Sequence, residues 1–334
     1  MLTRRIFVKQ MGMLLGALSI PFPVFSKLIN TEMSDSKQYD VIIVGGSYSG
    51  LAAAMALGRA LRNVLVIDNG DPCNKQTPHS HNFLTNDGKS PSEIATIAKE
   101  QVMKYESVRL LNGTVTNGRK TAEGYNVVLG GGEVYGAKKL VFATGIKDIM
   151  PAIPGFAECW GISVLHCPYC HGYEVRHQKT GIFANGDIAF ELATLISNWT
   201  NELTVFTNGL SELSGTQLTK LEKHNIQIVE DKISKLNHDK GYITEVVFED
   251  SSSIRLAAMY ARLPFMQHSS LHEELGCEIS PEGYIKIDQA QKTTIHGIFA
   301  CGDNTTRMRT VANAVSMGTT TGLMVNKELI EEEF

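Results

Sequence analysis

The most restrictive feature of the chain is a glycine-rich turn set between two apolar runs. Residues 39–44 form a nearly continuous apolar run, which is typical of a parallel strand buried on both faces. The turn Gly45-Gly46-Ser47-Tyr48-Ser49-Gly50 follows, then an alanine-rich stretch over 51–61 that predicts a helix, and a second strand over 64–67 that ends at Asp68. This order, with an acid about 20 residues beyond the turn, predicts a βαβ unit that binds a dinucleotide.

The residues of this turn suit a phosphate-bearing ligand. Gly45 allows the tight turn, and Gly50 lets the helix pack closely on the strand. Amides at the helix start would face a pyrophosphate, and Asp68 would accept a hydrogen bond from a ribose hydroxyl. Ser47 departs from the usual pattern, because its Cβ crowds a position where such turns carry glycine. A G-x-x-x-x-G turn alone could join any strand to any helix, so the prediction depends on the complete unit.

Length and charge narrow the classes of protein to consider. At 334 residues, the chain exceeds the size at which one core usually keeps growing, which predicts two domains. A hydrophobic content of 43% and a charged content of 20% are those of an ordinary globular protein. The net charge of -4 gives no electrostatic reason to expect a nucleic acid partner.

The first 35 residues have a different composition from the rest. Arg4 and Arg5 precede an apolar run over residues 11–25, and no acid occurs before Glu32. This run is too short for a comfortable membrane span, and the pattern resembles a twin-arginine export signal. We therefore expect a leader over residues 1–35 and a periplasmic or exported protein. An uncleaved membrane anchor, or a chance basic start on a cytoplasmic protein, are the alternatives.

A second constraint is the pair of cysteines in His166-Cys167-Pro168-Tyr169-Cys170-His171. Two cysteines separated by two residues can form a redox couple, whose thiolate is stabilised where the pair opens a helix. Half of a zinc site and an inert pair are the alternatives, but zinc needs four ligands and the chain has no second C-x-x-C. The other cysteines have no interpretable spacing and are predicted to be small apolar core residues: Cys73, Cys159, Cys277 and Cys301.

Further strands end in glycine or acid, where open α/β sheets bind ligands. One covers 139–143 and ends at Thr144-Gly145, and another runs through Gly297 to Gly302-Asp303, with a helix expected over 310–329. A second βαβ unit follows the cysteines, with a strand over 180–184, a turn over 185–189, a helix to about residue 199 and a strand over 202–206. Its turn is a possible nicotinamide-nucleotide turn with Ala184 at the first glycine position, while Gly186 and Ala189 are kept.

The order of these pieces resembles the thioredoxin reductase family of flavoproteins, over about residues 39–330. Within this family, the motif HCPYCHGYE and the sequence of residues 77–85 resemble the branch of gliotoxin-type dithiol oxidases. The resemblance implies an α/β protein with two nucleotide-binding, Rossmann-like, three-layer domains, the second inserted in the first. It implies these segments: an FAD-binding domain over 36–150 and 275–334, and an NAD(P)-type domain over 151–274 that carries the cysteine pair.

The resemblance also implies roles for single residues. Cys170 would lie next to the flavin, and Cys167 would exchange with a thiol substrate. His171 occupies the place of a reductase aspartate and could hold or relay a proton, unless it is a surface imidazole. His166 has the same ambiguity, whereas His79 and His81 could line the flavin ring or satisfy the backbone of their own loop. The FAD contacts would come from Gly45, Ser47, Gly50, Asp68, Thr144, Gly145, Gly302, Asp303 and Ala312.

The end of the second βαβ unit bears on NADP(H). Reductases that use NADPH carry arginines there for the 2′-phosphate, whereas this chain has Thr207-Asn208-Gly209 and no basic residue before Lys220. NADP(H) binding is therefore uncertain, and two directions of reaction stay open. One is reduction of a thioredoxin-like protein, and the other is oxidation of a small dithiol with oxygen as acceptor. A flavin redox sensor is a third alternative, and a homodimer is expected from the family.

Overall fold

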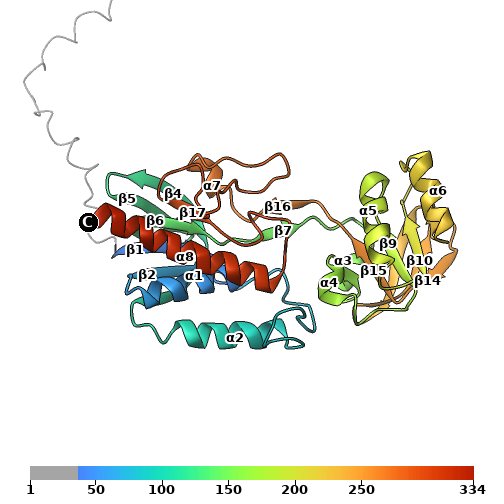
Figure 1. Ribbon diagram of the computed structural model, residues 1–334, viewed down its shortest axis with the longest axis horizontal. Helices are drawn as coiled ribbons and strands as arrows, with labels where there is room; N and C mark the ends of the chain where they lie inside the picture. The colour runs from blue at the N-terminus through green and yellow to red at the C-terminus, as the bar shows by residue number, and fades with distance from the viewer. Residues whose placement is uncertain (1–36) are drawn as a thin grey trace, which may run out of the picture. The chain divides into compact units, whose positions relative to one another are not determined.

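The structure, a computed structural model, describes residues 37–334, so the predicted leader over 1–35 lies outside the described residues (Figure 1). The strands are β1 (Lys37–Val44), β2 (Val64–Asp68), β3 (Val108–Asn112), β4 (Val115–Thr121), β5 (Gly124–Leu129), β6 (Val134–Phe142), β7 (Ile146–Asp148), β8 (Val164–Leu165), β9 (Thr180–Phe183), β10 (Leu203–Phe206), β11 (Gln227–Val229), β12 (Ile233–Asp239), β13 (Tyr242–Phe248), β14 (Ser253–Arg255), β15 (Ala258–Ala261), β16 (Phe265–Gln267) and β17 (Ile298–Ala300). The helices are α1 (Tyr48–Arg59), α2 (Pro91–Val102), α3 (Phe156–Cys159), α4 (Pro168–His171), α5 (Gly186–Ile196), α6 (Gly215–Lys223), α7 (Leu271–Glu274) and α8 (Val311–Glu333).

The first sheet joins two segments that are far apart in sequence. Its order is β3-β2-β1-β6-β5-β4, and β17 pairs with β6 in parallel (Figure 1). β1 lies parallel to both β2 and β6, and its residues Val41, Ile42 and Ile43 have no exposed surface. The apolar run therefore forms the central parallel strand that the sequence predicted, because both faces of the sheet are covered.

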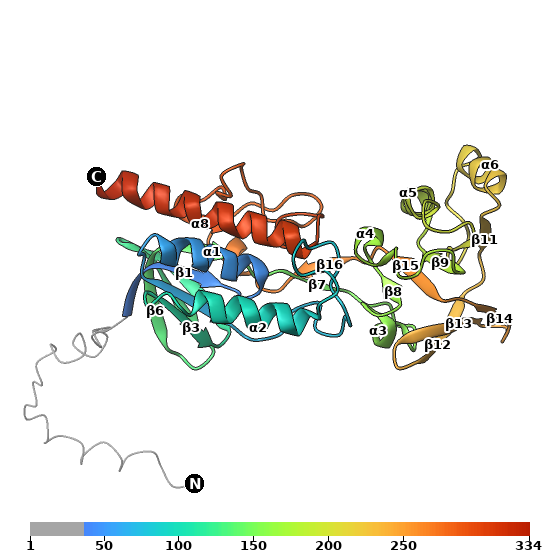
Figure 2. The ribbon, with the colours of Figure 1, turned by 60° about the horizontal axis from the view of Figure 1, so that its bottom comes forward.

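Helices α1, α2 and α8 supply the core on one face of this sheet, and Figure 2 shows α8 running alongside α1. Two glycines make this close approach possible. A Cβ added at Gly318 would collide with the backbone of Ser49, and one at Gly322 would lie 2.7 Å from the carbonyl oxygen of Ala53. The C-terminal helix thus presses directly on the helix that begins at the glycine turn.

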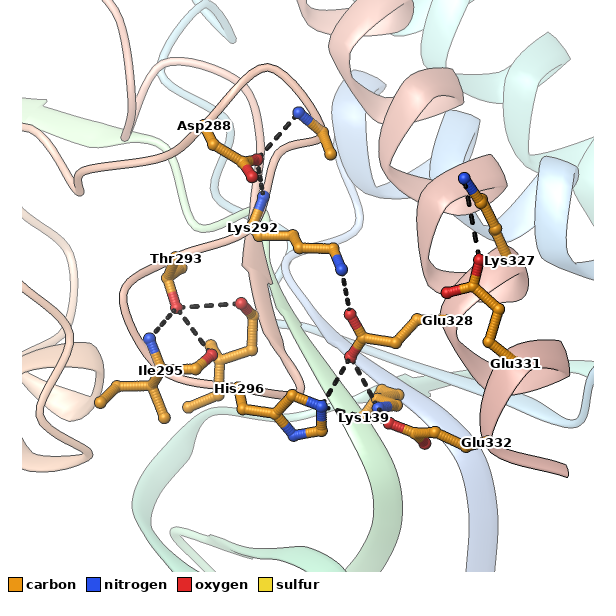
Figure 3. Close-up of polar contacts among 12 residues, drawn as sticks. Lys139, Asp288, Lys292, Thr293, Ile295, His296, Lys327, Glu328, Glu331 and Glu332 are labelled. Carbon is orange, nitrogen blue, oxygen red and sulfur yellow. Dashed lines mark hydrogen bonds and ion pairs between the residues drawn. The ribbon is translucent and has the colours of Figure 1, made fainter.

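An ion-pair network with a buried Lys139–Glu328 pair at its centre fixes α8 to β6 (Figure 3). Lys139 of β6 is 2% exposed, and its Nζ lies 2.7 Å from Glu328 Oε1 and 2.5 Å from Glu332 Oε1. Lys292 pairs with the other oxygen of Glu328 at 2.5 Å, and His296 Nε2 lies 3.3 Å from Glu332 Oε1. The histidine and the two glutamates converge as metal ligands do, but two lysines neutralise the carboxylates, so the cluster is an ion-pair network.

The second sheet has the parallel order β11-β10-β9-β15-β8, and an antiparallel sheet β12-β13-β14 packs with it. Two connections join it to the first sheet, and their strands β7 and β16 pair antiparallel. This arrangement is the pair of α/β units, one inserted in the other, that the resemblance implied. Leu271 of α7 belongs to the first core, so the chain returns to the first sheet before the boundary at 274/275 that the sequence predicted.

The longest described helix is α8, with 23 residues. Within residues 37–334, neither it nor any other helix combines the length and the apolar character needed to cross a membrane.

Candidate active site

A cavity of about 530 Å³ extends from the glycine turn to the cysteine pair. This volume is within the range of cofactor and substrate pockets. The predicted residues that line it are Gly45, Ser47, Asp68, Thr144, Gly145, Cys167, Cys170, His171 and Asp303. The cavity therefore brings together the first nucleotide turn and the redox pair, which are more than a hundred residues apart in sequence.

The glycine turn owes its shape to two tight contacts. Gly45 has φ +106°, and a Cβ there would collide with the carbonyl group of Ala143. A Cβ at Gly50 would likewise collide with the Gly45 carbonyl, so α1 begins directly against β1. The amide of Gly46 donates to Asp68 Oδ1 at 3.0 Å, which joins the turn to the end of β2. The turn thus presents a backbone cradle to the cavity, with the acid of β2 beside it.

Three of the predicted cofactor residues do not line the cavity: Gly50, Gly302 and Ala312. Gly50 and Gly302 act through packing, since Gly302 has φ +89° and a Cβ there would lie 2.6 Å from Ser49 Oγ. Near the start of α8, Val311 and Ala314 face the cavity in place of Ala312.

A buried charge cluster lies at one wall of the cavity. Arg309 forms a bidentate pair with Asp148, with both nitrogen–oxygen distances at 2.8 Å, and its Nε lies 3.6 Å from Asp303 Oδ2. Burial raises the pKa of Asp303 to about 6, against the opposing attraction of Arg309. The Nε of Arg309 is buried and has no hydrogen-bond partner among the described residues. A polar group of a ligand would satisfy it.

The cysteine pair lies at the start of α4, a short helix that packs against Trp199, just beyond the end of α5. Cys167 is the extended N-cap, and Pro168 occupies the first helical position, where its missing N–H costs nothing. Gly172 ends the turn against Trp199, whose ring also meets Tyr169 edge-on at 5.5 Å. Tyr169, between the two cysteines, stays exposed.

The two sulfurs differ in acidity. The Cys170 thiol donates to Cys167, and this contact together with backbone amides of Cys170 and Tyr169 lowers the pKa of Cys167 despite its burial. The same contact, with burial, strongly raises the pKa of Cys170. Cys167 is therefore the more acidic of the two thiols, and Cys170 is the one that keeps its proton longer as the pH rises. This asymmetry agrees with an exchanging role for Cys167.

The nearby histidines lie in different electrostatic environments. Burial lowers the pKa of His166 to about 3, so this ring is neutral. Burial also lowers the pKa of His171, but the carboxylate of Glu174 opposes the effect. His79 and His81 line the cavity, and His79 Nδ1 lies 2.9 Å from the Gly88 carbonyl oxygen, so it also satisfies its own loop.

The second nucleotide turn, at Ala184, Gly186 and Ala189, lies away from this cavity. Asn185 Oδ1 already caps the first amide of the helix, because it accepts from Gly186 at 2.8 Å, and it also accepts from the amide of Glu212 at 2.8 Å. Asp187 lies in the first turn of α5. An anion at this helix start would displace the asparagine and face the carboxylates of Asp187 and Glu212.

Several cavity residues escaped the sequence analysis. Cys73 is exposed to the cavity, so its prediction as an apolar core residue was wrong, whereas Cys159, Cys277 and Cys301 are buried and unbridged as predicted. Arg309 was also missed. Arg309 follows Arg307 just before the last helix, and this short basic segment is its only sequence signal.

The fold and the site together define a flavin-type disulfide oxidoreductase. Residues 39–318 match the family model described as pyridine nucleotide-disulphide oxidoreductase, and the chain belongs to this family. Thioredoxin reductase tcpT of Claviceps purpurea (strain 20.1) is 30% identical over 311 residues, which cover 90% of this chain and 97% of that protein. The resemblance to thioredoxin reductases is therefore confirmed.

Solved structures agree with this assignment. A crystal structure of an oxidoreductase from Agrobacterium tumefaciens is 36% identical, with a TM-score of 0.82 over 88% of this chain and 99% of its own. A putative thioredoxin reductase TrxB from Bacillus anthracis is 32% identical, with a TM-score of 0.85 over 89% of this chain and 100% of its own.

The protein is therefore an FAD-dependent disulfide oxidoreductase, and the cavity fits that cofactor. The backbone cradle at Gly45 and Gly46 suits a pyrophosphate, and the orphaned Nε of Arg309 offers a donor within the same cavity wall. The cysteine pair opens on the same space, as a two-electron exchange with a flavin requires.

Proposed function

We propose that this protein oxidises a dithiol substrate through Cys167 and Cys170 and does not draw on NADPH. The observation that supports this most is the second nucleotide turn, where Asn185 occupies the helix start that a pyrophosphate would need. Glu230 accepts from the amide of Ser211 in the same region, so a further carboxylate lies where arginines would hold a 2′-phosphate.

The cysteine pair suits the oxidation of a thiol. A substrate thiolate attacks Sγ of Cys167, and the bond between Cys167 and Cys170 breaks. The second substrate thiol then displaces Cys167, so the substrate leaves as a disulfide and the protein keeps both electrons as a dithiol. Cys170 leaves in the first step and Cys167 in the second, where the lowered pKa of Cys167, which comes first from its contact with Cys170, makes it a good leaving group. Bound FAD supplies the acceptor for the two electrons, and oxygen or another oxidant then receives them.

Flavin absorbance tests the direction of the reaction. Under anaerobic conditions, we expect dithiothreitol to bleach the flavin of the holoprotein and NADPH to leave it oxidised. In air, dithiothreitol should support oxygen uptake, and Cys170→Ser should abolish it because the redox couple is lost. Bleaching by NADPH but not by dithiols would refute the proposal. Unchanged uptake in Cys170→Ser would show that the cysteines are not in the electron path.

The second candidate is an NADPH-fed reductase of a thioredoxin-like protein. The names of relatives favour it, since tcpT of Claviceps purpurea and sirT of Leptosphaeria maculans are both called thioredoxin reductases. The anaerobic mixture separates the two candidates, because only this one requires bleaching by NADPH. A homodimer, also drawn from the family, is tested by sedimentation of the holoprotein.

We also propose that the protein works outside the cytoplasm. The support is the Arg4-Arg5 pair and the apolar run that follows, all outside the described residues. An oxidase without NADPH suits such a compartment, where pyridine nucleotides are not expected. Fractionation of cells that carry Arg4→Lys/Arg5→Lys tests the export, which this change should prevent.

A further inference from the structure

Trp199 lies just beyond α5 and packs against the helical turn that carries the redox pair. Its indole meets the ring of Tyr169 edge-on, with the ring centroids 5.5 Å apart. A Cβ added at Gly172 would lie 2.8 Å from the indole Nε1, so this glycine lies directly against the same ring. Trp199 thus contacts the residue before Cys170 and the second residue after it.

The backbone of Trp199 is held by contacts that do not involve α4. Its carbonyl oxygen accepts from the amide of His177 at 2.9 Å, and the hydroxyl of the neighbouring Thr200 donates to the carbonyl oxygen of Gln178 at 2.8 Å. The two segments joined in this way run directly into β9 and β10 of the second sheet. The indole is therefore presented to α4 from a backbone that the sheet fixes.

The turn of α4 needs such support, because a single helical turn is not stable by itself. The amide of Cys170 donates to the carbonyl oxygen of Cys167 at 3.3 Å, and the amide of Gly172 donates to that of Pro168 at 2.7 Å. Pro168 is buried, whereas Tyr169 is 62% exposed. Packing against Trp199 adds support that the hydrogen bonds of the turn do not supply.

We propose that Trp199 is a positioning residue of the redox site, which holds α4 so that Cys167 and Cys170 keep the arrangement of their dithiol form. This inference rests on the redox role proposed for the two cysteines. Both are free thiols in the structure. The Cys170 thiol, and then the backbone amides of Cys170 and Tyr169, lower the pKa of Cys167 despite its burial. A loosened turn would weaken these contacts, so the thiolate would be less stable and the disulfide would be favoured.

A redox equilibrium tests the proposal. Anaerobic holoprotein is equilibrated with mixtures of dithiothreitol and its cyclic disulfide, so that two electrons and two protons pass between the two pairs of sulfurs. Acid quenching and mass spectrometry then give the fraction of protein disulfide. In Trp199→Ala we expect the equilibrium constant to shift about three- to tenfold towards the protein disulfide, the scale of one aromatic contact. Trp199→Phe, which keeps a ring against Gly172, should recover most of the wild-type value.

Alkylation of the reduced holoprotein by iodoacetamide separates positioning from simple exposure of the cysteines. In Trp199→Ala the rate at Cys167 should be lower by about three- to tenfold at pH 7, because less thiolate is present. At pH 10 it should match wild type, since every accessible thiol is then ionised. Faster alkylation at both pH values would mean that the change merely uncovers the sulfur, and it would overturn the proposal.

Phe190→Ala is the matched control, since it also truncates an aromatic side chain. Phe190 of α5 packs on the core of the second sheet and faces Lys220 of α6, so this variant should keep the wild-type equilibrium and alkylation profile. An equal shift in the control, or an unchanged equilibrium in Trp199→Ala, would refute the role of Trp199. Neither measurement needs oxygen or NADPH, so both stay readable if the proposed oxidase activity is absent, which oxygen uptake alone decides.

Discussion

At the scale of single residues, Asp303 lies in a cavity wall where burial disfavours its charged form. Its side chain is 18% exposed, and burial raises its pKa to about 6 even though Arg309 lies nearby. Arg309 directs both terminal nitrogens to Asp148, so Asp303 receives only the flank of the guanidinium group. The native state therefore binds a proton at Asp303 more tightly than the unfolded chain does, and folding becomes less favourable as this carboxyl ionises.

We predict that Asp303→Asn stabilises the flavin-free protein at pH 8. A folded pKa of about 6 against an unfolded value near 4 corresponds to a gain of up to about 3 kcal/mol in the free energy of unfolding. The gain should shrink as the pH falls from 8 to 5, because the native carboxyl of wild type then becomes neutral. Urea unfolding of both proteins at the two pH values measures it. A gain that is independent of pH would contradict this account of Asp303.

Sequence alone identified the residues whose role is local but not those that depend on a distant partner. Cys167, Cys170 and the glycine turn could be predicted because each belongs to a motif of contiguous residues, and all of them line the cavity. The pair Arg309–Asp148 joins residues 161 positions apart, and no local pattern marks it. Cys73 was misjudged for the same reason, since its exposure depends on a cavity that other segments enclose.

At the scale of elements, α8 packs on α1 at the point where the glycine turn ends, so the position of α8 affects the turn. α1 begins at Tyr48, three residues before the predicted start, because the helix follows directly from the turn. Gly318 faces the backbone of Ser49 in the first turn of α1, so the two helices touch where the cofactor cradle begins. The small sheet β12-β13-β14 was not predicted, because no motif marks its strands.

We predict that Gly318→Ala lowers the free energy of unfolding by about 1–3 kcal/mol, because the added methyl group forces α8 away from Ser49. The displaced α1 should also bind FAD more weakly, which the ratio of flavin to protein absorbance after gel filtration would show. Gly215→Ala at the start of α6 is the control, since a Cβ there meets nothing within 4 Å. That variant should change stability by less than about 1 kcal/mol. Equal effects of the two changes would exclude the packing explanation.

At the scale of the whole molecule, two α/β units of similar topology have diverged in electrostatics. The first presents a backbone cradle to the cavity, with Asp68 hydrogen-bonded to the turn itself. In the second, the side chain of Asn185 caps the first amide of α5, and Asn208 accepts from the amide of Ile233 at 2.8 Å, so polar groups of the unit itself occupy the turn and the segment after β10. The fold of a nucleotide unit can persist without its ligand, because strands and helix pack independently of the turn chemistry.

Because the fold of the second unit does not depend on ligand binding, we predict that a few substitutions can give it affinity for NADPH without rebuilding the unit. Leu210 is 84% exposed and Glu212 is an exposed acid beside Gly186, so Leu210→Arg/Glu212→Arg should be tolerated. Each new charge-assisted contact with the 2′-phosphate should tighten binding by about tenfold, since such contacts contribute about 1.5–3 kcal/mol. Fluorescence titration of the holoprotein with NADPH measures the gain.

Glu202→Arg, at the opposite end of β10, makes the same charge reversal as Glu212→Arg and should leave affinity nearly unchanged. An equal gain in that control would mean that net charge, rather than the position of the arginines, governs NADPH binding.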